Sequence, residues 1–128
     1  MRLFGDPEAN RAAAARARAY AAARRSEREH FAHVLGEHLC ALRACLQADD
    51  AAGVAQRLAQ LEGLAARATE GHPTQRLCRR LADEAAADLN TPRTTWLLQL
   101  LAAEQLRLAG GLPGCPDAVL QELARPGP

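Results

Sequence analysis

Three of the chain's four histidines lie within nine residues of one another, in a segment whose apolar spacing predicts a helix. On a helix, His30, His33 and Glu37 share one face, because side chains three and four residues apart are neighbours. Two neutral imidazoles and a carboxylate in that arrangement can bind a transition metal such as zinc. The spacing therefore predicts a candidate metal site at these three residues. The alternative interpretation is a solvated polar flank of an amphipathic helix.

Two short motifs in this segment resemble the ligand elements of known metal-binding helical bundles. Glu27-x-x-His30 is similar to the element of di-iron carboxylate bundles, and His33-x-x-x-Glu37 is similar to one element of hemerythrin-like bundles. Both families place a second such element on another helix. This chain has none, since its remaining histidine, His72, lies beside a glycine and a proline in an expected loop. We therefore predict no cofactor beyond, at most, a single transition metal.

The sequence around His33 also resembles the histidine-phosphotransfer domains. The resemblance lies at residues 32–36, 39–43, 47–50 and 56–62. Those domains are four-helix bundles that relay a phosphoryl group through an exposed helical histidine, so the resemblance implies His33 as the acceptor. The lysine that follows the acceptor in the family is replaced here by Gly36 or Glu37, and a carboxylate beside the acceptor repels an incoming phosphoryl group. A degenerate phosphotransfer-like module that uses His33 is thus a second alternative for the function.

His38 has different surroundings, because it falls in the apolar stripe formed by Leu35, Leu42 and Cys45. We expect a buried, neutral imidazole that donates a hydrogen bond to a backbone carbonyl. A pH-sensing role is the alternative.

The composition predicts an all-α protein without catalytic machinery. Alanine and leucine supply most of the apolar residues, whereas isoleucine is absent and aromatic residues make up 3% of the chain. Helix formers therefore greatly outnumber strand formers. All 16 basic residues are arginine, which excludes Schiff-base and P-loop lysine chemistry. Ser26 is the only serine, and no nucleophile motif or phosphate-binding glycine loop occurs, so we expect that the protein is not an enzyme.

Capping signals and apolar periodicity place the expected helices. Asp6-Pro7 opens a first helix that either continues to residue 48 or breaks at the capping box that begins with Ser26. The apolar phase changes near residues 24–30, which favours a kink or a change of packing partner there. Further helices are expected after Asp49-Asp50, after Thr74, over residues 93–108 and over residues 116–124.

The expected connections between helices are short, which makes consecutive helices antiparallel. We therefore predict an up-and-down helical bundle of four to five helices with a short C-terminal helix. The whole chain, residues 1–128, is expected to form one domain. It would comprise an alanine- and arginine-rich N-terminal helix or arm (7–25), a bundle core (26–109), and a short helix with a tail (110–128).

The last long helix is a candidate surface for binding a partner. Its apolar residues cover more than half of its circumference, which indicates either a central position in the bundle or a strip left for a partner. We expect the strip, and place Trp96, Leu98 and Leu101 on it.

A second candidate surface is basic. Arg11, Arg18 and Arg25 recur every seven residues along the first helix and predict a charged stripe. Such a stripe can bind an acidic partner through charged hydrogen bonds. The alternative interpretation is a solvated face of the helix. Together the two surfaces predict a non-enzymatic helical adaptor, chaperone or regulatory protein that binds another protein or associates with itself.

Charge and hydropathy indicate which classes of partner and which cellular location to expect. A net charge of +1 gives no strong field for nucleic acid or membrane, and Tyr20 is the only aromatic residue available to stack on bases beside the arginines. The most apolar stretch, residues 96–103, is too short to span a bilayer. The first residues lack the apolar segment of a secretory signal, and the four cysteines form no C-x-x-C pair. We therefore expect a cytoplasmic protein with reduced thiols and with neither a nucleic acid nor a membrane as its partner.

Overall fold

A computed structural model describes residues 6–126 of this chain. The first five residues, where no secretory signal is expected, and the last two residues of the expected tail lie outside the described residues. Within 6–126 the chain forms five helices and no strand, which confirms the all-α prediction. The helices are α1 (Pro7–Gln47), α2 (Ala51–Arg67), α3 (His72–Ala87), α4 (Pro92–Gly110) and α5 (Asp117–Ala124).

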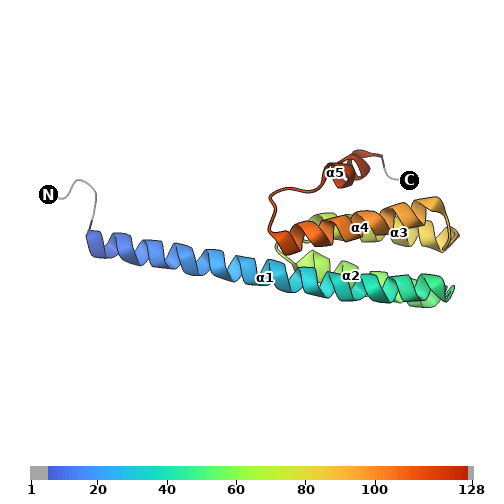
Figure 1. Cartoon of the computed structure of the whole chain (residues 1–128), viewed down its shortest axis with the longest axis horizontal. Coiled ribbons are helices and arrows are strands. Elements are labelled where there is room, and N and C mark those ends of the chain that lie inside the picture. The colour runs from blue at the N-terminus through green and yellow to red at the C-terminus, as the bar shows by residue number, and fades with distance from the viewer. Residues whose placement is uncertain (1–5, 127–128) are drawn as a thin grey trace.

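The first four helices form an up-and-down bundle (Figure 1). Each of them packs against the next along the chain, and α4 returns to pack against α1, so the four helices close a ring. The short helix α5 lies across α3 and α4 on the outside of this ring. The predicted bundle with a short C-terminal helix is therefore confirmed.

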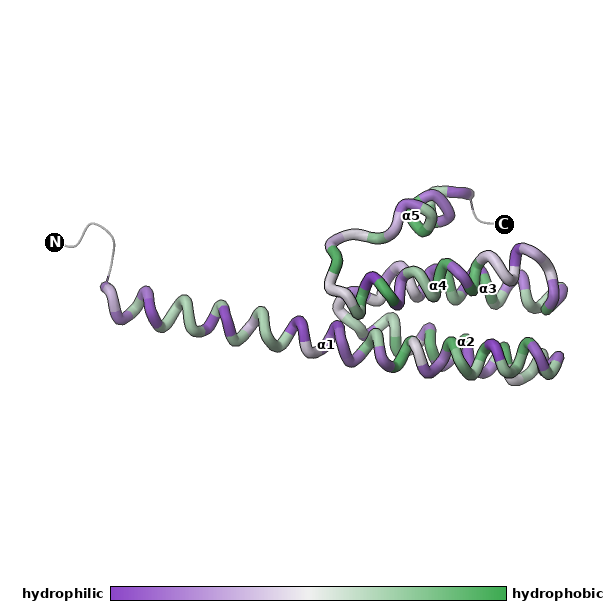
Figure 2. The backbone as a smooth tube through the Cα atoms, viewed as in Figure 1, coloured by the Kyte–Doolittle hydropathy of each residue, from purple (hydrophilic) through white to green (hydrophobic). Residues whose placement is uncertain are grey.

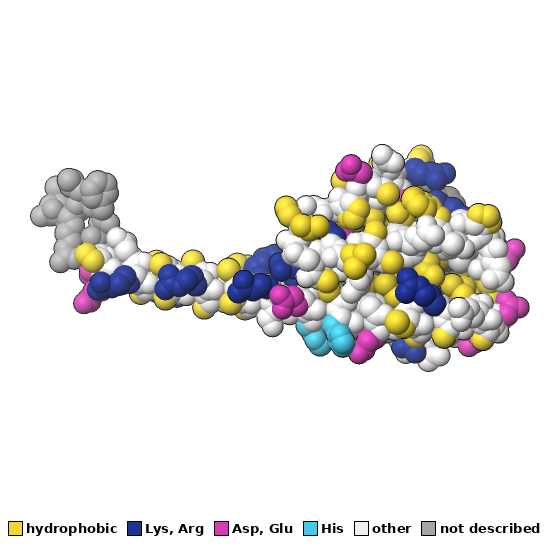
Figure 3. Space-filling model, in the orientation of Figure 1, with side chains coloured by type: hydrophobic (Ala, Val, Ile, Leu, Met, Phe, Trp, Pro, Cys, Tyr) yellow, Lys and Arg dark blue, Asp and Glu magenta, His cyan; other side chains and the backbone are white. Residues whose placement is uncertain are grey.

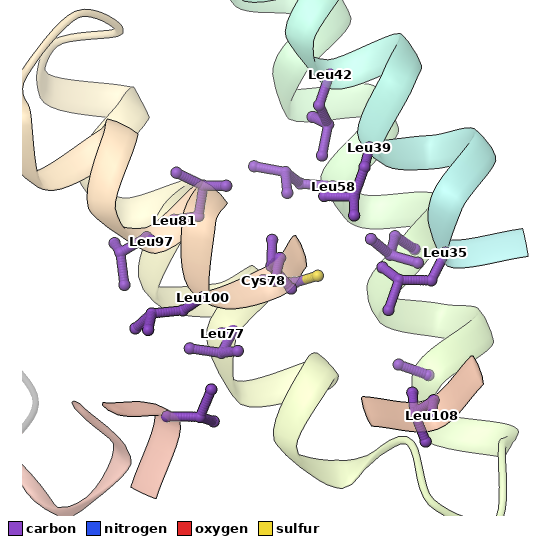
Figure 4. Close-up of a cluster of buried hydrophobic side chains, with 14 of the residues drawn as sticks. Leu35, Leu39, Leu42, Leu58, Leu77, Cys78, Leu81, Leu97, Leu100 and Leu108 are labelled. Atoms are coloured by element: carbon purple, nitrogen blue, oxygen red, sulfur yellow. The ribbon is translucent and has the colours of Figure 1, made fainter. Parts of the chain in front are cut away.

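Leucine side chains from all four long helices fill the centre of the bundle (Figure 4). They recur at the three- and four-residue spacing that keeps them on one face of each helix. A leucine that is fully removed from water contributes about 1.5–3 kcal/mol of stability relative to an exposed one. The most deeply buried leucines are Leu35 and Leu42 of α1, Leu58 and Leu61 of α2, Leu77 and Leu81 of α3, and Leu97, Leu100, Leu101 and Leu108 of α4.

Helix α1 is much longer than the bundle, and its first half projects into solvent (Figures 1 and 2). We call residues 7–27 the arm; every one of them is exposed, and burial begins at Arg28 and Phe31. The helix continues through Ser26, so the single long helix is the one of the two expected possibilities that the structure has, and its packing changes where the apolar phase changes. Alanine is the strongest helix former, and the packed half of α1 supplies the nucleus from which a helix propagates. The arm therefore keeps its helix without packing of its own.

Local capping explains where the other helices begin and end. The Thr91 side chain accepts a hydrogen bond from the backbone N–H of Thr94 at 3.0 Å and opens α4. Gly111, with a φ of 68°, closes α4 in the left-handed conformation that glycine tolerates best. Thr74 does not cap α3, because that helix already begins at His72 and Thr74 is buried in its first turns.

None of the four cysteines forms a disulfide, and they differ in accessibility. Cys40 is exposed on α1, whereas Cys78 is buried in the core, and burial raises the pKa of its thiol to about 12. Since the thiolate is the reactive form, we expect iodoacetamide to label Cys40 in the native protein and Cys78 only after unfolding. Mass spectrometry of timed labelling reactions measures both rates. Equal rates at the two cysteines would contradict the packing of α3 described here.

Candidate functional site

The predicted metal ligands do not converge. His33 and Glu37 form a surface pair, with Nε2 of the imidazole 2.9 Å from Oε1 of the carboxylate and both side chains about 70% exposed. His30 is also exposed but lies toward a pocket described below. Figure 3 shows histidine side chains on the open surface near an acidic side chain. Over residues 6–126, no group of three or more His, Cys, Asp or Glu side chains is placed to hold a metal ion. The geometry thus favours the polar-flank interpretation.

His38 is buried, as predicted, with 8% of its surface exposed. Burial lowers the pKa of its imidazole, and repulsion from Arg57 lowers it further, so the ring is neutral at neutral pH. The predicted hydrogen bond to a backbone carbonyl is wrong, because Nδ1 has no partner among the described residues.

The apolar strip expected on α4 is largely core. Leu101 is fully buried and Leu98 is half-buried against the core, so the expected exposure of Leu101 is wrong. The reason is that α4 packs against three helices, α1, α3 and α5, which cover most of its circumference. Trp96 and Leu106 stay exposed, at 42% and 69%. They lie ten residues apart, about 15 Å along the helix, and do not form a continuous ridge.

The basic stripe lies on the arm. Arg11, Arg18 and Arg25 are exposed, and none of them makes an ion pair or hydrogen bond within residues 6–126. The arm carries five arginines against two glutamates, whereas residues 28–128 carry ten arginines against twelve acidic residues. Figure 3 shows basic side chains recurring along the arm with apolar side chains between them. A basic helix therefore projects from a weakly acidic bundle.

A pocket of about 330 Å³ opens where the arm joins the bundle; we call it the arm-base pocket. Its apolar wall comes from three helices: Phe31 and Val34 of α1, Leu64 of α2 and Leu108 of α4. Five charged side chains and one histidine also line the pocket and form its rim, namely Arg24, Glu27, Arg28, His30, Arg67 and Glu70. An apolar wall with a charged rim is typical of a binding site.

The two carboxylates at the rim are already engaged by the protein itself. Glu27 accepts a hydrogen bond from the Thr69 hydroxyl at 3.0 Å. Glu70 accepts one from the buried guanidinium of Arg107 at 3.2 Å. Neither carboxylate is therefore fully available to an incoming cation.

The arginines at the rim are engaged less fully. Nε of Arg28 donates to the carbonyl of Leu108 at 3.1 Å and so satisfies the C-terminal end of α4. Arg24 donates to the Tyr20 hydroxyl at 2.9 Å, and this hydrogen bond raises the pKa of the guanidinium. Within residues 6–126, Arg67 makes no hydrogen bond or ion pair. The charge available to a ligand at this rim is therefore positive.

A buried ion pair on α4 contacts the rim of the pocket through Glu70, and the sequence did not predict it. The carboxylate of Glu104 is 0% exposed and receives two hydrogen bonds from Arg107, at 2.7 and 2.8 Å. Arg107 also donates to Glu70 at the rim and to the carbonyl of Leu112. The signal for it was present in the sequence, since Glu104 and Arg107 are three residues apart on the most apolar helix.

No model of a protein family matches this chain, and no curated protein or solved structure matches it either. In the part of the chain that the structure describes, no helix is long and apolar enough to cross a membrane. The fold and the surface define the class: a four-helix bundle with a projecting basic arm and a pocket at the base of that arm.

Proposed function

We propose that this chain is a non-enzymatic helical adaptor, chaperone or regulatory protein, which acts in the cytoplasm and binds another protein through its arm. The observation that carries the proposal is the arm itself, a helical segment of 21 residues that is exposed on all sides and continuous with a packed helix. At about 1.5 Å per residue, the arm is about 31 Å long. Because all of its residues are exposed, the arm contributes little buried area to the stability of the bundle.

A rigid helix is a favourable binding element because it loses little conformational entropy when a partner docks. One side of the arm is lined by small residues (Ala12, Ala15, Ala19 and Ala22), which let another helix approach closely. An alanine face buries little area, and at about 25 cal/mol per Å² it contributes less than a leucine face would. Binding through the arm therefore needs its arginines as well.

The charge of the arm gives the first test. Replacement of Arg11, Arg18 and Arg25 by glutamine (R11Q/R18Q/R25Q) keeps a polar, unbranched side chain of similar helix propensity but removes three charges. Three exposed ion pairs of about 0.5 kcal/mol each amount to about tenfold in affinity. We expect affinity capture from the native host, quantified by mass spectrometry, to show about tenfold less of the partner with this variant.

A control makes the same type of substitution at two arginines of the bundle. The variant R43Q/R79Q removes two exposed arginines that lie away from the arm. It should retain the partner as well as the wild type does. If the arm variant and the wild type retain the same proteins in equal amounts, the arm is not the binding surface and the proposal is wrong.

A further inference from the structure

From the arm-base pocket we propose the chemistry of the partner: an acidic amphipathic helix that lies along the arm and inserts a large apolar side chain into this pocket. The inference rests on the proposed function, since it assigns the partner of the same surface. Three features support it: the volume of the pocket, the face of the arm beside the pocket, and the charge at the rim.

The volume and wall of the pocket fit an apolar side chain. About 330 Å³ lies at the lower end of the range for ligand sites, roughly 300–1,000 Å³. Val34 and Leu64, which form part of the wall, are only half-buried, so both would lose contact with water when the pocket is filled. Burial of such a wall by a leucine or phenylalanine side chain is favourable.

The arm makes a helix the fitting occupant rather than a small molecule. Tyr20, Arg24, Glu27 and Phe31 follow one another at intervals of four, three and four residues, which places them on one face of α1. Tyr20 lies on the arm and is 64% exposed, whereas Phe31 lies in the wall of the pocket. The face therefore leads from the arm directly into the pocket, and a helix laid along it contacts both.

Charge decides between a foreign helix and a second copy of this chain. The rim carries three arginines against two glutamates and is therefore net positive, and Arg67 has no hydrogen-bond or ion-pair partner within residues 6–126. The arm of a second copy, with five arginines and two glutamates, would bring like charge to this rim. A helix with glutamates or aspartates beside its apolar side chain brings the opposite charge, and its carboxylates can accept hydrogen bonds from the guanidinium groups.

The test selects ligands by their chemistry. A displayed library of random 16-residue peptides is enriched on the full chain, and the enriched sequences are read. We expect them to combine acidic residues with large apolar residues at helical spacing. Enrichment of basic peptides, or of sequences with no such pattern, would overturn the inference.

Three variants of the full chain then locate the binding of one enriched peptide by fluorescence anisotropy. Val34→Trp fills the pocket and should weaken binding about tenfold or more, while R24Q/R67Q should weaken it about fivefold and reduce its salt dependence. Ala44→Trp, an exposed position on the same helix, is the matched control and should bind as the wild type does. Unchanged binding by Val34→Trp and by R24Q/R67Q contradicts the assignment. Arg24 and Arg67 are exposed, so R24Q/R67Q should fold and tests the assignment even if Val34→Trp does not fold.

The other occupants give distinct results. A second copy in the pocket would appear as a concentration-dependent dimer in sedimentation velocity, lost in Val34→Trp. A nucleic acid would appear as salt-sensitive binding of a labelled duplex that R24Q/R67Q weakens and Val34→Trp leaves intact. Either result overturns the inference. If R11Q/R18Q/R25Q loses the cellular partner but Val34→Trp retains it, the proposed function stands and this inference alone fails.

Discussion

Replacement of Arg107 by methionine is expected to lower the free energy of unfolding by about 3–5 kcal/mol. The guanidinium donates two hydrogen bonds to the carboxylate of Glu104, which is 0% exposed, and the Cys115 thiol donates a third, longer one at 3.9 Å. Without Arg107, this carboxylate stays in the core with no cation beside it. The cost of leaving such a charge buried exceeds what the ion pair itself contributes. Urea unfolding followed by circular dichroism measures the change.

The double variant E104M/R107M separates charge from packing. It removes both charges and fills the space with apolar side chains, so we expect it to be clearly more stable than R107M alone. If both variants lose the same stability, the uncompensated carboxylate is not the cause. In R107M, Glu70 also loses its partner, which changes the rim of the arm-base pocket.

The sequence predicted the helices well because their signals are local. Asp6 and Asp50 cap helices at the expected places, and the leucine spacing shows which face of each helix is buried. Local signals do not report how many neighbours a helix has. The apolar coverage of α4 therefore suggested a strip for a partner, whereas Leu101 faces the core because three helices surround α4.

The candidate site was predicted only in part for the same reason. The exposure of Arg11, Arg18 and Arg25 follows from the pattern of one helix. The arm-base pocket combines side chains from α1, α2 and α4 that lie far apart in the chain, so no spacing in the sequence indicates it. For the histidine cluster, the sequence pattern predicted a site that the structure does not form. Residues that are neighbours on one helix need ligands from a second element before their side chains can converge on a metal.

The C-terminal helix α5 depends on another ion pair that no local pattern predicted. The Glu122 carboxylate is 1% exposed and is held by Arg80 of α3 and Arg93 of α4, each with a hydrogen bond of 2.8 Å. Arg76 also donates a hydrogen bond to the carbonyl of Leu123 at 2.8 Å, and α5 buries Val119 and Leu123 as its apolar residues. Hydrogen bonds to charged groups contribute about 1.5–3 kcal/mol, so Glu122→Gln should lower the free energy of unfolding by about that amount at pH 7.

The same carboxylate gives a pH dependence whose sign is fixed by its pKa. The hydrogen bond from Arg93 is the main cause that lowers the pKa of Glu122 below its ordinary value, which is about 4.3. Ionised Glu122 therefore stabilises the fold fully above that ordinary value, and the stabilisation is lost as the pH falls through the lower folded-state pKa.

We expect the stability difference between wild type and Glu122→Gln to be largest near neutral pH and to shrink in strong acid. Urea midpoints at a series of pH values from 7 to about 2 measure it. His38, whose pKa is lowered by burial, destabilises the fold at pH values below about 6.5. That loss occurs in both proteins and cancels in the difference. A difference that stays constant down to pH 2 would mean that the glutamine variant loses packing rather than charge, and that the two arginines do not hold α5 through the ionised carboxylate.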